Sequence, residues 1–175
     1  FISADLAVRF SSLSQIGLVV LVAIPLFVGL GLLLVPLQVG SSTIAFPRAA
    51  QLAFWTWFTS GLLMSVVWFV DGGPAGTGTK SVDLGYLGLI ATVLGLLLAS
   101  ICIVTTVTTM RTEGMGLDRV PFFSWAMFVA TTAWLLTLPV LVANTVLVYV
   151  DTHNGAVLFS DPASSWNAIV WAALL

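Results

Sequence analysis

Long apolar runs separated by short polar connections dominate the sequence. Four runs reach about the length that crosses a bilayer: Ile16–Val35, Ala50–Val70, Leu84–Met110 and Phe122–Val150. A helix rises about 1.5 Å per residue, so a core about 30 Å thick needs about 20 apolar residues. The runs are apolar all round, whereas barrel strands alternate. We therefore predict an all-α integral membrane protein, a bundle of four transmembrane helices plus the start of a fifth after Trp166, forming a single membrane domain over residues 1–175.

Composition agrees with a lipid environment. The 175 residues are 59% hydrophobic and only 7% charged, against about 25% charged in soluble proteins. The net charge of −2 and the lack of basic runs exclude a nucleic-acid-binding role, which requires Lys and Arg to neutralise phosphates. We recognise no signal peptide and expect the chain to continue beyond Leu175.

The basic residues predict the orientation. Arg48 lies in the first connection, and Arg111 and Arg119 lie in the third, whereas Lys80 stands alone in the second. Short loops rich in Lys and Arg face the cytoplasm or matrix, so the first and third connections are predicted on that side. Tryptophans near the predicted span ends suggest an interfacial aromatic belt, formed by Trp55, Trp57, Trp68, Trp125 and Trp166.

Few residues offer chemistry. Gly72–Ser81 (GGPAGTGTKS) resembles a phosphate-binding loop, but Thr79 breaks the Gly-Lys spacing and the stretch joins two membrane helices, which favours a plain loop. His153, the one histidine, lies in a turn-like stretch and is predicted to be a solvated loop residue. The predicted spans carry no Asp, Glu, Lys, Arg or His, which disfavours a pump or an ion-coupled transporter. Asn144 and the threonines at 105, 106, 108 and 109 are predicted to hydrogen-bond to neighbouring helices rather than to line a pathway.

Three stretches carry a resemblance to a known family. They are GLGLLLVPLQVGSSTIAFPRAAQLAFW (29–55), TTVTTMRTEGMGLDRVPFFSW (105–125) and LPVLVANTVLVYVD (138–151) with FSDPA. They resemble the patterns G-F-G-N-Y-L-V-P-L-Q-I-G-A-x-D-x-A-F-P-R, T-T-I-x-N-M-R-x-P-G-M-T-x-D-R-x-P-L-F and L-P-V-L-A-G-A-x-T-x-L-L-x-D of subunit I of the heme-copper oxidases, the catalytic subunit of cytochrome c oxidase. The resemblance covers residues 12–175 and implies the second to fifth helices of that fold and the start of the sixth.

The departures from the family pattern fall on chemistry-bearing positions. By the resemblance, the second-helix histidine that ligates the low-spin heme corresponds to Ser14, and the Asp that opens a proton channel corresponds to Thr43. The two channel Asn positions correspond to Leu32 and Ala50, and the fourth-helix Asn to Cys102. Shape-bearing residues are retained at Pro36, Gly40, Phe46, Pro47, Arg48, Trp55, Gly114, Arg119, Pro121 and Pro139.

This pattern leads to three hypotheses. The favoured one is a noncatalytic, subunit-I-like membrane scaffold chain of a respiratory terminal oxidase, packed against other membrane subunits and lipids in a bacterial plasma membrane or mitochondrial inner membrane. It predicts no catalytic, cofactor-binding or metal-ligating residue in 1–175: Cys102 and the four methionines are poor candidates, and heme and copper are expected in a partner chain or a downstream region. The second is a divergent catalytic subunit whose heme and copper ligands lie beyond Leu175. The third is a small-molecule channel or transporter on the same fold.

Overall fold

The computed structural model describes residues 18–19, 21–71, 79–112 and 114–153, and helices account for most of them. The elements are α2 (Ile24–Val39), α3 (Pro47–Asp71), α4 (Thr79–Thr109), the short 3₁₀ helix η3 (Leu117–Arg119) and α5 (Phe122–His153). Four of these helices are long and apolar enough to cross a membrane. The predicted all-α membrane class is therefore confirmed, and the described residues contain no strand.

The helices extend beyond several predicted bounds. Helix α2 continues through Pro36 and ends at Gly40, whose φ of 77° gives the left-handed C-cap that glycine tolerates. Helix α3 begins at Pro47, because proline suits the first turn, where its missing N–H is not needed. The predicted loop assignment of the Thr79–Ser81 end of the glycine-rich stretch was wrong, since α4 begins at Thr79; residues 72–78 lie outside the described part of the chain.

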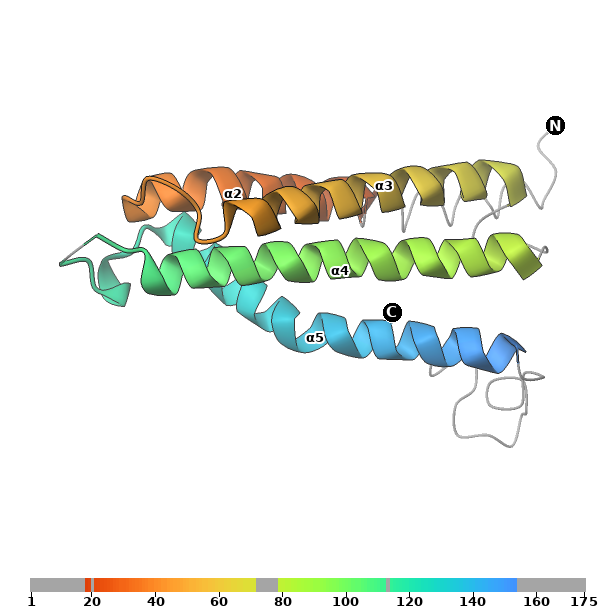
Figure 1. The fold of residues 1–175 in the computed structure, drawn as a ribbon. Coiled ribbons are helices and arrows are strands. Elements are labelled where there is room, and N and C mark those ends of the chain that lie inside the picture. The colour runs from red at the N-terminus through yellow and green to blue at the C-terminus, as the bar shows by residue number, and fades with distance from the viewer. Residues whose placement is uncertain (1–17, 20, 72–78, 113, 154–175) are drawn as a thin grey trace. The chain divides into compact units, whose positions relative to one another are not determined.

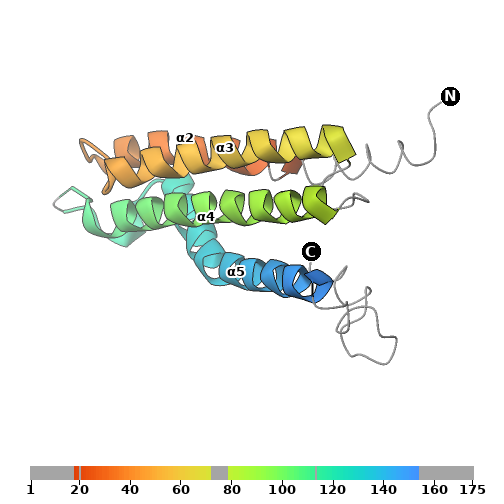
Figure 2. The same ribbon diagram turned by 45° about the vertical axis from the view of Figure 1, so that its right-hand side comes forward.

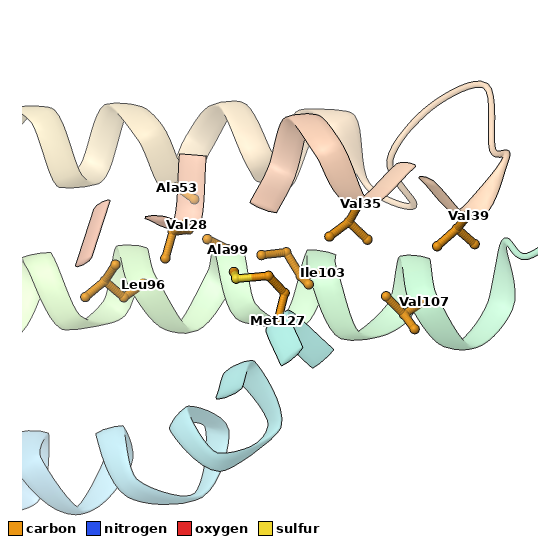
Figure 3. Close-up of a cluster of buried hydrophobic side chains, with 9 residues drawn as sticks. All are labelled: Val28, Val35, Val39, Ala53, Leu96, Ala99, Ile103, Val107 and Met127. Carbon is orange, nitrogen blue, oxygen red and sulfur yellow. The ribbon is translucent and has the colours of Figure 1, made fainter. Parts of the chain in front are cut away.

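Helix α4 packs against both α2 and α3, as Figures 1 and 2 show from two directions. Figure 3 shows the core of this packing, a cluster formed by Val28, Val35, Val39, Ala53, Leu96, Ala99, Ile103, Val107 and Met127. Glycines permit the close approach of the helices. A Cβ atom added at Gly95 would lie 3.1 Å from the Ala53 carbonyl oxygen, and one at Gly31 would lie 2.6 Å from Cε of Met127.

The first and third connections lie at the same end of these helices (Figure 1). The backbone N–H of Thr112 donates a hydrogen bond to the Val39 carbonyl, with 3.3 Å between nitrogen and oxygen. The two connections are therefore on one side of the membrane, as the arginine distribution predicts. That this side is the cytoplasm or matrix stays a prediction.

The described chain divides into two packed units inside α5, between Leu138 and Pro139. The part of α5 up to Leu138 belongs to the first unit and supplies Met127 to its core (Figure 3). The part from Pro139 to His153 is described by itself. Within it, the Thr145 hydroxyl donates to the Leu141 carbonyl at 2.8 Å, so that hydroxyl is satisfied by its own helix.

Candidate functional site: an apolar pocket and a hydrogen-bonded loop

The connection between α2 and α3 is fixed to α4 by side-chain hydrogen bonds. The Ala45 backbone N–H donates to Oγ1 of Thr106 at 3.1 Å, across 61 positions of sequence. The Thr106 hydroxyl in turn donates to the Cys102 carbonyl at 2.6 Å. The Cys102 thiol lies 3.8 Å from the Phe46 carbonyl oxygen, which it faces as a weak donor. These contacts hold the loop Gly40–Phe46, hereafter the inner loop, in one shape.

The turn at the start of the inner loop has its own support. The Ser41 N–H donates to the Pro36 carbonyl at 3.0 Å, and the Ser41 hydroxyl donates to the Thr43 carbonyl at 2.9 Å. Glycine is favoured at position 40 for two reasons: its φ is positive, and there is no room for a side chain. A Cβ atom there would lie 2.6 Å from Cγ2 of Thr112.

Thr43 stands on the exposed surface of the inner loop. By the resemblance, this is the position of the acid that opens a proton channel. A threonine hydroxyl does not ionise near neutral pH, so it cannot release and take up a proton as a carboxylate does. The inner loop therefore has the shape but not the acid of the family pattern.

A pocket of about 160 Å³ opens between α2, α3 and α4. Its lining consists of Pro25, Val28, Gly29, Leu32, Ala53, Phe54, Trp57, Gly95, Leu96 and Ala99. All of these residues lie within the spans Leu21–Val39, Pro47–Phe69 and Val82–Thr109. The only polar side-chain atom among them, Nε1 of Trp57, is buried and has no hydrogen-bond partner among the described residues. A water molecule needs two to four polar partners, which this lining does not offer.

The positions that correspond to channel asparagines now have defined surroundings. Leu32 lines the pocket, and Ala50 is partly buried near the start of α3. Cys102 is fully buried and faces the inner loop. None of the three offers a side-chain amide that could hold a chain of water molecules.

Trp57 and Trp68 correct the prediction of an aromatic belt. Trp57 lines the pocket near the middle of α3 and Trp68 is only 5% exposed, so neither lies in a membrane–water interface on the outer surface of the chain. Trp55 and Trp125 are exposed, as a belt requires, and Trp166 lies outside the described residues. Distance from the end of an apolar run could not reveal which way each indole points.

Two further polar contacts within the spans were not predicted from the sequence. The hydroxyls of Ser60 in α3 and Thr92 in α4 lie 2.9 Å apart in a buried pair. The Ser124 hydroxyl of α5 donates to Oε1 of Gln38 in α2 at 2.6 Å. Both pairs stabilise helix–helix packing, which is the usual role of such groups in lipid. From the sequence, these contacts could be expected only where a small polar residue in one span faces a row of small residues in another.

Candidate metal ligands are scattered. The described residues contain no group of three or more His, Cys, Asp or Glu side chains that could hold a metal ion. The prediction of a loop position for His153 was wrong: it forms the last residue of α5, and its Nδ1 lies 3.0 Å from the Tyr149 carbonyl oxygen. Met64 and Met127 are buried packing residues, the latter against Gly31. Ser14 lies outside the described residues.

Comparison with known proteins gives a consistent relationship. The sequence model of a family described as "Cytochrome C and Quinol oxidase polypeptide I" matches residues 15–175. "Cytochrome c oxidase subunit 1" of Bacillus subtilis is 31% identical over 99% of this chain and 30% of its own length. "Quinol oxidase subunit 1" of Bacillus spizizenii is 30% identical over 90% of this chain and 26% of its own length. "Alternative cytochrome c oxidase subunit 1" of Bradyrhizobium diazoefficiens is 31% identical over 91% of this chain and 30% of its own length. The chain thus spans under a third of the length of these relatives.

Proposed function

Because this chain belongs to the family of cytochrome c and quinol oxidase polypeptide I, we propose that its residues 1–175 serve as a noncatalytic membrane scaffold within a respiratory terminal oxidase complex. In this role the helices hold neighbouring subunits and lipids in place. Electron transfer, oxygen reduction and proton uptake take place on other residues.

One observation carries the proposal: the pocket that contains Leu32, which by the resemblance corresponds to a channel asparagine, is lined by apolar side chains. Proton transfer over many ångströms requires a relay of ionisable groups or ordered water, and intramembrane ionisable groups are its usual mark. Leu32 and the glycine and alanine residues around it offer neither. Thr43, on the inner loop, lacks the carboxylate that would deliver protons to such a relay.

The contacts of the inner loop support a structural role. Gly40, the Ala45–Thr106 hydrogen bond and the Thr112–Val39 hydrogen bond fix the end of the helices where the inner loop lies. A scaffold needs this rigidity as much as an enzyme does. The polar groups named here stabilise packing, whereas by the resemblance the channel acid and asparagines are replaced by Thr43, Leu32, Ala50 and Cys102.

The donor set of the segment does not fit heme or copper. The family's low-spin heme takes two histidines by the resemblance, and the whole segment has only one. That residue, His153, is exposed at the end of α5, and its Nδ1 is engaged with the Tyr149 carbonyl. We therefore derive no step through a metal bound to this segment.

A second reading is favoured by the coverage of the relatives. Since the matched region is 30% of the Bacillus subtilis protein, a full set of heme and copper ligands would have to lie elsewhere in the polypeptide. In that reading the polypeptide is a divergent catalytic subunit that takes up protons without the route through Thr43 and Leu32.

The two readings are separated by purifying the complex from native membranes through a tag on this chain. The subunits are identified by mass spectrometry, and the hemes are quantified by reduced-minus-oxidised spectra before and after the subunits are separated. The scaffold reading predicts that the hemes and copper remain with a different polypeptide. Hemes that remain with this polypeptide favour the second reading. An iron or copper ion bonded to any side chain of residues 1–175 in a structure of the complex would overturn both the scaffold reading and the absence of ligands.

A further inference from the structure

We draw no further inference here: the strongest candidate, the apolar pocket between α2, α3 and α4, belongs to the site already described, and nothing in the structure shows what fills it.

Discussion

The inner loop and the pocket both belong to the packing of α2 and α3 on α4, yet their polar groups differ. In the inner loop, backbone N–H groups of Ala45 and Ser41 find acceptors on Thr106 and Pro36. In the pocket, the positions around Leu32 offer only apolar side chains and the indole N–H of Trp57, which has no partner among the described residues. Shape depends on backbone hydrogen bonds and glycine positions, whereas proton chemistry depends on a few side chains. The first can therefore persist while the second is removed.

The comparison also explains why the pocket can be apolar without loss of the fold. Helices α3 and α4 are also joined by the Ser60–Thr92 hydrogen bond, whose two residues are not part of the lining. A polar lining in this location would need water or further hydrogen bonds to satisfy it. An apolar lining needs neither, so the replacement is structurally tolerated.

The largest effect is expected at Gly40, the pivot of the inner loop. Gly40→Ala forces a side chain into a left-handed conformation and toward Cγ2 of Thr112, and we expect it to destabilise the chain by about 1–3 kcal/mol. Cys102, the one cysteine, is fully buried beside the inner loop, so its reaction with a maleimide fluorophore during heating reports unfolding there.

Gly114→Ala is the matched control for Gly40→Ala. Gly114 also has a positive φ, of 90°, but nothing lies within 4 Å of the added Cβ atom. Gly114→Ala should therefore lower the free energy of unfolding by about 1 kcal/mol, which is the cost of the left-handed conformation without a steric clash. The temperature at which half of Cys102 has reacted is compared for the two variants. Equal temperatures would show that the inner loop is not packed against Thr112, and the inner loop would then not differ from the pocket in the way described above.

The next effect is expected in the pocket itself. Leu32→Asn places an amide, as in the family pattern, in a lining that cannot pair with it, and we expect a loss of about 1–3 kcal/mol. Leu32→Met, which keeps volume and polarity, should cost under about 1.5 kcal/mol. The Cys102 reactivity midpoint measures both. An Asn variant as stable as wild type would mean that the pocket is hydrated in the complex, which would weaken the scaffold proposal.

The sequence predicted the number and type of the spans because apolar length is a sufficient signal in lipid. It missed helix ends, since the hydropathy of Pro36 and of Thr79–Lys80 does not show whether the backbone stays helical there. The same-end placement of the two arginine-bearing connections was predicted correctly, because loop charge reflects topology.

The site was predictable only in part. The resemblance alone indicated that Leu32 and Thr43 lack the family's polar groups. The packing of three helices was needed to show that Leu32 lines a pocket together with Gly95 and Trp57. The Ala45–Thr106 bond links a backbone group of a loop to a side chain 61 positions away, and no periodicity encodes that pairing. Trp57 was misplaced for the same reason, since its distance from the helix end says nothing of the direction of its ring.

A smaller effect is expected at Thr106. Thr106→Val removes the acceptor of the Ala45 N–H while keeping the shape of the side chain, and we expect a loss of about 1 kcal/mol. Thr105→Val is the control, because the Thr105 hydroxyl bonds only within its own helix among the described contacts, to the carbonyls of Ile101 and Cys102. If Thr105→Val lowered the Cys102 reactivity midpoint as much as Thr106→Val, the inner loop would not depend on this bond.

The smallest effect is expected from Trp57→Phe, and it bears most directly on the pocket. The indole Nε1 of Trp57 is buried without a partner among the described residues, so the native state already carries the cost of desolvating that N–H. Phenylalanine removes the donor and with it that cost, while losing part of the ring's apolar contact. The two changes oppose each other, and we expect a net effect within about 0.5 kcal/mol on the Cys102 reactivity midpoint. Trp68→Phe, whose Nε1 is also buried without a partner among the described residues, should behave in the same way.

A loss above about 1 kcal/mol confined to Trp57→Phe would mean that its N–H is bonded in the assembled complex. The acceptor would then be a water molecule or a partner group in the pocket, and the contrast between a satisfied loop and a purely apolar pocket would no longer hold.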